Sequence, residues 1–387
     1  MPELLFLLLP VAAAYGWFMG RNSLKHKELK GRANITRNLS SGLNFLLTDQ
    51  EDKAIEQLLE LLDIEATTID TYLALANLFR RKGDWDKAIR IHEKLHKLTL
   101  PKLQAQQIQF ELAKDYYSAG LYDRAEYLLL QIVNCEPLRE AILKQLFSIF
   151  MATHELNKAV ALGAEVDKTQ SKSLRIALAN MHAQCLQDQL SATQSEQVTK
   201  AYLNDLADLA SRYPQAVRPR FELAKYALEQ HDKATAKGAL LSIIKQKPQW
   251  SADLLPILSQ CQMAADEWYQ LLTLLADKHH NVSARLLLSD WLSEHGSVKA
   301  AEHYLLDKLR QQPNIRLFQK LLQLRQQESA VAAEVLSSVE ELVNAYLASK
   351  VLYNCRSCGF KTRQPYWFCP SCQQWETVEP ISGVDGR

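Results

Sequence analysis

The residues whose types and spacing most clearly predict chemistry are four cysteines near the end of the chain. Cys355, Cys358, Cys369 and Cys372 form the pattern C-x2-C-x10-C-x2-C. Each C-x2-C turn can direct two thiolates at one ion, so two such turns complete a tetrahedron of sulfur ligands. The pattern therefore predicts one bound metal ion, and both zinc and iron accept this ligand set. Because protein sulfur would fill every position, we expect a structural or redox role and no hydrolytic chemistry.

These cysteines lie in a small segment, residues 349–387, that we predict to be a separate metal-binding domain. A segment of this size cannot bury enough apolar surface to fold on a core alone, so a metal ion is expected to stabilise it. The alternative of four free thiols would leave the segment without that support. The other three cysteines, Cys135, Cys185 and Cys261, stand alone, and we expect them to be small buried side chains in a reducing compartment.

A second pattern with chemical meaning is His92-Glu93-Lys94-Leu95-His96, which matches the zinc-protease motif H-E-x-x-H. On a helix, this spacing can present two imidazoles to zinc beside a general base. The motif falls within a helical repeat, however, and Leu95 occupies one of its core positions. We therefore predict a structural role, with His92 buried between helices and His96 on the surface. No catalytic residue is assigned, and an enzyme is not expected.

The elements that must carry these residues are helices with a regular repeat. Ala54, Ala88, Ala125 and Ala159 are separated by 34, 37 and 34 residues, and 34 is the tetratricopeptide period. Small residues are needed where two helices of a hairpin cross closely, and bulky residues fill the space around them. The sequence predicts an all-α array of about eight or nine hairpins over residues 39–348, with a long loop at 187–196. An accidental spacing within a generic helical bundle is the alternative.

Composition supports helices and argues against a nucleic-acid partner. Twelve glycines and twelve prolines among 387 residues are too few for loop-rich β or nucleotide-binding architectures. The 45 lysines and arginines nearly balance the 44 aspartates and glutamates, so the chain has no overall basic field for phosphates.

The N-terminus predicts a membrane anchor over residues 1–20, followed by a basic linker over 21–38. Residues 4–20 carry no charge and would span about 26 Å as a helix, close to the thickness of a hydrocarbon core. Cations follow this run and none precedes it, so the N-terminus is expected outside and the rest of the chain in the cytoplasm. A cleaved signal peptide is the alternative, but it would need its cations first.

Taken together, the three parts resemble the lipopolysaccharide assembly protein B family of membrane-anchored tetratricopeptide proteins. The resemblance covers nearly the whole chain. It is carried by the opening ELLFLLLPVAAAYGWFMGR, the repeat segments LFRRKGDWDKAIRIH and AGLYDRAE, and the ending CRSCGF with YWFCPSC. It implies a helical-hairpin superhelix with an N-terminal transmembrane helix and a rubredoxin-type C-terminal domain. Gly359 matches the glycine that usually follows a rubredoxin knuckle, whereas Gln373 departs from it.

The resemblance also implies a function, namely regulation of lipopolysaccharide synthesis by a non-enzymatic adaptor. The family is thought to bring the deacetylase LpxC to the membrane protease FtsH, so that degradation restrains lipid A production. It implies a single-pass protein of the bacterial inner membrane that also meets other lipopolysaccharide-assembly proteins and an inner-membrane sensor. An iron electron carrier on a protein-binding scaffold is the alternative function, and a homodimer stays open.

Overall fold

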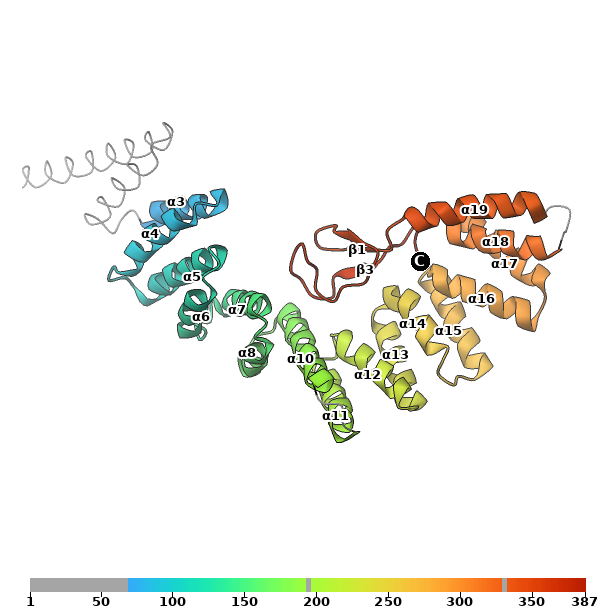
Figure 1. Cartoon of the computed structure of the whole chain (residues 1–387), viewed down its shortest axis with the longest axis horizontal. Helices are drawn as coiled ribbons and strands as arrows, with labels where there is room; N and C mark the ends of the chain where they lie inside the picture. The colour runs from blue at the N-terminus through green and yellow to red at the C-terminus, as the bar shows by residue number, and fades with distance from the viewer. Residues whose placement is uncertain (1–68, 193–195, 329–332) are drawn as a thin grey trace, which may run out of the picture. The chain divides into compact units, whose positions relative to one another are not determined.

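The computed structural model describes residues 69–192, 196–328 and 333–387 of the chain (Figure 1). The predicted anchor, the basic linker and the first part of the predicted array lie outside these residues. Among the described helices, none is both long enough and apolar enough to cross a membrane. The described residues divide into two compact units, the first ending at residue 145 and the second beginning at residue 146.

The first unit contains helical hairpins of the predicted repeat. Its described helices are α3 (Ile69–Lys82), α4 (Trp85–His96), α5 (Lys102–Ser118), α6 (Tyr122–Gln131) and the beginning of α7 (Arg139–Thr153). Ala88 and Ala125 have no exposed surface, as expected for residues at helix crossings. Gly83 and Gly120 make the turns within the two hairpins with φ of 91° and 78°, a left-handed conformation that favours glycine. The repeat predicted for this part of the chain is confirmed.

The second unit continues the hairpins and ends in a small sheet. Its helices follow one another as α8 (Leu156–Ala161), α9 (Gly163–Asp167), α10 (Lys172–Ala192), α11 (Glu196–Arg212), α12 (Arg218–Glu229), α13 (Lys233–Gln246), the 3₁₀ turn η3 (Pro248–Trp250), α14 (Ser251–Leu258), α15 (Ala265–Lys278), α16 (Val282–His295), α17 (Val298–Gln311), α18 (Ile315–Glu328) and α19 (Ala333–Ser349). The repeat alanines Ala159, Ala236 and Ala301 are again completely buried. The register of small residues therefore persists through this unit.

The prediction of a long loop at 187–196 is wrong. Helix α10 continues to Ala192 and α11 begins at Glu196. Most of the residues that suggested a loop are glutamines and serines, and glutamine is a good helix former while serine is only mildly unfavourable. The extra residues between Ala159 and Ala236 therefore lengthen helices.

Two buried arginines, which the sequence did not single out, join neighbouring hairpins. Arg285 on α16 is 1% exposed; its Nε donates to the carbonyl oxygen of Ala276 on α15 at 3.2 Å, and its Nη1 donates to Gln312 beyond α17 at 3.1 Å. Arg220 on α12 makes the same kind of bridge, to the carbonyl oxygen of Ala216 at 3.2 Å and to the side chain at the end of α13. Burial lowers the pKa of both guanidinium groups, but the surrounding oxygens satisfy their donors.

The C-terminal domain is a three-stranded antiparallel sheet, which we call the ribbon. Its strands are β1 (Tyr353–Cys355), β2 (Lys361–Thr362) and β3 (Val378–Pro380), in the spatial order β2-β1-β3. Tyr353 pairs with Thr362 on one side and with Pro380 on the other. Its small core contains Tyr353, Val378 and two of the four cysteines. This short sheet holds the two cysteine knuckles side by side.

Candidate metal centre and its docking on the repeats

The two C-x2-C segments fold into knuckles with the same hydrogen-bond pattern. In the first, the N–H of Cys355 donates to the carbonyl oxygen of Phe360 at 2.7 Å, and the N–H of Gly359 donates to that of Cys355 at 2.8 Å. In the second, the N–H of Cys369 donates to Gln374 at 2.9 Å, and the N–H of Gln373 donates to Cys369 at 2.9 Å. The second knuckle therefore repeats the first, and each directs its two sulfurs to the same side.

The four sulfur atoms converge in one cluster. All four Sγ atoms lie within 4.8 Å of one another, with 3.6 Å between Cys355 and Cys372 and 3.7 Å between Cys358 and Cys369. A tetrahedron with metal–sulfur bonds of about 2.3 Å has edges of about 3.8 Å, so these separations fit a four-thiolate ion. The predicted metal site is present, and its ligand set is suited to zinc and to iron alike.

The surroundings of the sulfurs show how the ion would be held. Burial opposes ionisation of Cys355, but hydrogen bonding to Thr377 and to backbone N–H groups outweighs it and lowers the pKa to about 6. The Cys355 sulfur lies 3.3 Å from the Thr377 hydroxyl. Burial raises the pKa of Cys369 to about 12, so this thiol needs a cation beside it to ionise at neutral pH. Cys358 is exposed, so one edge of the centre faces solvent.

The residue after each knuckle adopts the same left-handed backbone. Gly359 has φ of 77°, and Gln373 has φ of 56° at the equivalent place. A non-glycine residue pays about 1 kcal/mol for this conformation. The departure from glycine at Gln373 therefore leaves the geometry of the second knuckle intact.

The ribbon does not stand apart from the repeats, because an aromatic side chain anchors it there. Trp367, two residues before the second knuckle, stacks on Trp250 of η3 with ring centroids 5.3 Å apart and an interplanar angle of 9°. Phe221 of α12 meets the same indole edge-on at 5.5 Å. Stacked aromatic contacts of this kind add to the stabilisation from buried area. This anchor was not predicted from the sequence, although three aromatic residues of the segment YWFCPSC come directly before the second knuckle.

A buried carboxylate makes the second attachment. Glu376 is 1% exposed, and its Oε1 accepts from the backbone N–H groups of Val217 and Arg218 at 2.6 and 3.1 Å and from Asn180 Nδ2 at 3.0 Å. Its Oε2 accepts from Lys247 Nζ at 2.7 Å. Val217 and Arg218 begin α12, whose first N–H groups lack partners within the helix. The ribbon therefore caps a repeat helix with an anion where the helix dipole favours one.

The end of the chain provides a third attachment. Asp253 on α14 accepts from the Tyr353 hydroxyl at 2.8 Å and from Arg387 Nη1 at 2.9 Å. The side-chain amide of Asn314 donates to the carbonyl oxygens of Gly383 and Gly386 at 2.8 and 3.2 Å. The ribbon and its tail are thus tied to the repeats from α10 to α18.

The H-E-x-x-H segment has the structural role that was predicted for it. His92 is completely buried and its Nδ1 is paired with Asp115 of α5, whereas His96 is exposed. Asp115 also accepts from Arg80 at 2.7 Å, and Glu93 accepts from the Tyr116 hydroxyl at 2.6 Å. Among the described residues, the four ribbon cysteines form the only cluster suited to a metal ion. The motif contributes a buried polar contact between α4 and α5.

This role predicts that substitution of Asp115 destabilises the protein much more than substitution of His96. Asp115→Ala should destabilise the first unit by about 3–5 kcal/mol, because it strands the buried His92 imidazole and removes one of the two carboxylates paired with the partly buried Arg80. His96→Ala, on the surface, should stay within about 0.5 kcal/mol of the parent chain. Hydrogen exchange of the α4 and α5 amides measures both effects. A second metal equivalent that disappears with either His92→Ala or His96→Ala would contradict the structural role.

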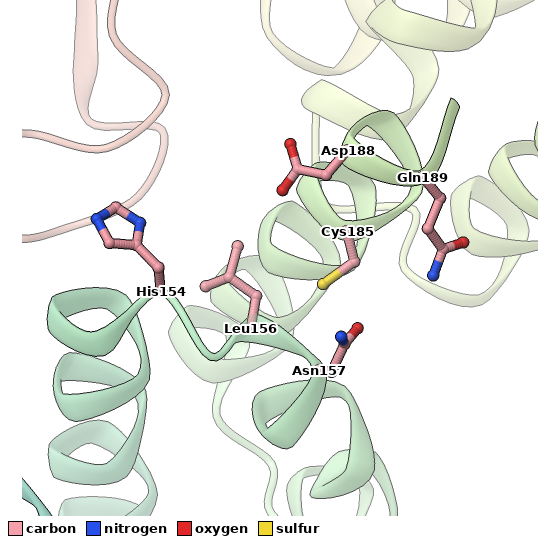
Figure 2. A pocket seen from close by; sticks show the side chains of 6 residues that line it. All are labelled: His154, Leu156, Asn157, Cys185, Asp188 and Gln189. Carbon is pink, nitrogen blue, oxygen red and sulfur yellow. The ribbon is translucent and has the colours of Figure 1, made fainter. Parts of the chain in front are cut away.

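The second unit also has a small open hollow between the turn after α7 and helix α10 (Figure 2). It holds about 280 Å³ and is lined by His154, Leu156, Asn157, Cys185, Asp188 and Gln189. Burial and the nearby Asp188 raise the pKa of Cys185, so its thiol stays protonated and is a poor nucleophile.

Cys135, Cys185 and Cys261 are all buried, as the sequence predicted for isolated cysteines.

The chain is similar to known proteins in its C-terminal domain and over its whole length. A family model described as a rubredoxin metal binding domain matches residues 353–380. Over its whole length the chain is 34% identical to lipopolysaccharide assembly protein B of Escherichia coli K12 and 31% identical to that of Haemophilus influenzae, with 100% of each protein covered. A solved structure of YrrB, described as a TPR protein with an unusual peptide-binding site, is 15% identical with a TM-score of 0.32 and covers 50% of this chain and 93% of its own.

Proposed function

The chain belongs to the lipopolysaccharide assembly protein B family, and from that premise we propose that it is a membrane-tethered, non-enzymatic adaptor that restrains lipopolysaccharide synthesis. It brings the deacetylase LpxC to the FtsH protease, and the resulting degradation of LpxC limits lipid A production. The observation that carries the proposal is full-length similarity to relatives of that name combined with an array of helical hairpins. Such arrays present extended surfaces to other proteins and require no substrate pocket.

The metal centre has a structural role in this proposal. When bound, the ion supplies four bonds to sulfur that join the two knuckles. The folded ribbon is then held on the repeats by two contacts. Trp367 stacks on Trp250, and Glu376 accepts hydrogen bonds at the start of α12. Cys355, Cys358, Cys369 and Cys372 would provide all four ligands of a tetrahedral ion and would leave no position for a substrate on it.

The proposed location is the bacterial inner membrane, with residues 4–20 as a single span and the bulk of the chain on the cytoplasmic side. Six cations among residues 21–37, and none before residue 4, support that orientation. A tether of this kind raises the local concentration of a bound client near a membrane protease by confinement alone. Other lipopolysaccharide-assembly proteins and an inner-membrane sensor are further partners in this proposal.

Removal of residues 4–20 tests the proposal. We expect the truncated chain to fold and bind its metal, yet to leave LpxC several-fold longer-lived, because client and protease are no longer confined together. The measurement is the half-life of LpxC in cells whose only copy of this protein is the truncated form. A control in which an unrelated single span replaces 4–20 separates tethering from specific contacts of the natural span. Normal LpxC turnover by the truncated chain would refute the adaptor.

A further inference from the structure

The groups of the repeats that hold the Glu376 carboxylate form a site for an anion. The Oε1 atom accepts from the N–H groups of Val217 and Arg218 at 2.6 and 3.1 Å and from Asn180 Nδ2 at 3.0 Å, and the Oε2 atom accepts from Lys247 Nζ at 2.7 Å. These donors come from α10, from the start of α12 and from the residue after α13. The backbone N–H groups begin a helix, where the dipole favours negative charge. The anion site is therefore a property of the array and not of the ribbon.

An aromatic site lies next to the anion site. Trp250 of η3 is 3% exposed and offers the flat ring face on which Trp367 stacks, and Phe221 of α12 meets the same ring edge-on. Phe221 lies one helical turn beyond the N–H groups that bind the carboxylate, and Trp250 belongs to the large core of this unit, which fixes its ring. The two sites together, which we call the docking site, consist of Asn180, Phe221, Lys247, Trp250 and the first N–H groups of α12.

The ribbon meets the docking site with one pair of opposed residues. The N–H of Glu376 donates to the carbonyl oxygen of Trp367 at 2.7 Å, and Phe368 pairs with Trp375 at the next position of the same antiparallel hairpin. Side chains of directly opposed residues project from the same face of a strand pair, and those of the next pair project from the other face. Trp367 and Glu376 therefore reach the repeats side by side. A ligand needs only this pair, an aromatic ring beside a carboxylate, to make the same contacts.

The ribbon leaves two buried polar groups of the docking site unpaired. The Oδ1 atom of Asn180 and the indole N–H of Trp250 are buried and have no hydrogen-bond partner among the described residues. Buried polar groups are normally paired, and an unpaired one lowers stability. A ligand that offered a donor to the amide oxygen, or an acceptor to the indole, would gain a bond that the ribbon does not make.

From these features we propose that the docking site binds a segment of a partner protein, namely a strand pair that carries an aromatic side chain beside a carboxylate, and that the ribbon is its internal competitor. A tethered competitor acts at an effective concentration on the order of millimolar, so the partner binds weakly while the ribbon is docked and tightly once it leaves. The docking site extends the proposed adaptor function by a second, conditional contact, and it does not require LpxC to be the partner.

Binding of a small peptide to the full-length chain in detergent tests this proposal. The probe is a fluorescently labelled hairpin closed by an Asn-Gly turn, with threonine at the other strand positions and one tryptophan directly opposite one glutamate. We expect weak binding to the parent chain, and binding at least about tenfold tighter to a variant whose ribbon is undocked by Trp367→Ala together with Glu376→Ala. Fluorescence anisotropy measures the dissociation constants. Glu376→Ala alone is a second route to a loosened ribbon and should give an intermediate affinity.

Matched variants locate the bound peptide. In the undocked chain, Lys247→Ala should weaken binding by about tenfold or more, because the carboxylate of the probe loses its cation. Lys245→Ala, at an exposed position of α13, should leave binding unchanged. A probe with glutamine in place of its glutamate should also bind about tenfold more weakly. Circular dichroism and metal content confirm that each variant is folded.

Three outcomes would overturn the proposal. They are no binding to the undocked variant, equal binding to the parent and undocked chains, and binding that neither Lys247→Ala nor the glutamine probe weakens. The measurement makes no use of LpxC turnover, so each of these outcomes leaves the adaptor function to its own test.

Discussion

Replacing Cys369 with serine should unfold the ribbon and release it from the repeats. Cys369 is completely buried at the centre of the ribbon core, and its loss removes one of four sulfur ligands. Metal binding to small four-ligand domains contributes about 10–16 kcal/mol, which exceeds what this short sheet can supply by burial. We expect the variant to lose its metal ion and the Trp367–Trp250 stack together. Metal analysis and tryptophan fluorescence measure the two losses.

The same experiment distinguishes a local loss of metal from loss of docking. The amides of Val217 and Arg218 should exchange with solvent much faster in Cys369→Ser, since Glu376 no longer accepts from them. Cys261→Ser is the matched control, because Cys261 is also buried in this unit but lies in the repeats. If Cys369→Ser lost the metal while both amides kept their protection, the ribbon would fold and dock without its ion.

Replacing Glu376 with alanine should weaken ribbon docking by about 3–5 kcal/mol, because a buried ionic contact loses one partner. The substitution strands the Lys247 ammonium, which is 14% exposed, and two backbone N–H groups at the start of α12. The knuckles do not use this side chain, so the metal ion should remain bound. Hydrogen exchange over α12 and the thermal unfolding of the full chain measure the effect.

The neighbouring glutamate of the ribbon supplies the control for that substitution. Glu379 lies in β3 and reaches Gln249 at 3.4 Å and Arg356 at 3.3 Å, both near the surface. Glu379→Ala should change stability by less than about 1 kcal/mol, because its partner Arg356 is 58% exposed and ion pairs that reach the surface contribute little. Comparable destabilisation by the two alanine substitutions would show that Glu376 has no special role in docking.

The repeats and the metal cysteines could be predicted because their signals are local. A hairpin needs a small residue at each helix crossing, and this requirement recurs at the repeat period, so Ala88, Ala125 and Ala236 reveal the array without any knowledge of what surrounds them. The knuckles are similar, because two residues between paired cysteines are enough to aim both sulfurs at one ion. The same logic failed at 187–192, where polar composition suggested a loop and the chain continues as helix.

The attachment of the ribbon could not be predicted, because its contacts join residues far apart and follow no period. Glu376 meets Asn180 and Val217 only after every intervening hairpin is in place. Trp367 could be recognised as an aromatic residue beside a knuckle. Its stacking partner Trp250 lies in no recognisable motif, so the contact between them could not be predicted. The pairing of His92 with Asp115 could not be predicted for the same reason, because nothing near the motif indicates which helix supplies the carboxylate.

The long separation of these contacts has a consequence for how the protein is made. Val217 lies 159 residues before Glu376, and Asn180 lies 196 residues before it. At synthesis rates of about 5–20 residues per second, the start of α12 is made about 8–32 seconds before the carboxylate that caps it. During that interval the hairpins can form by their local contacts, whereas the start of α12 stays open. A cell short of the metal ion would therefore accumulate chains with finished repeats and an open start to α12.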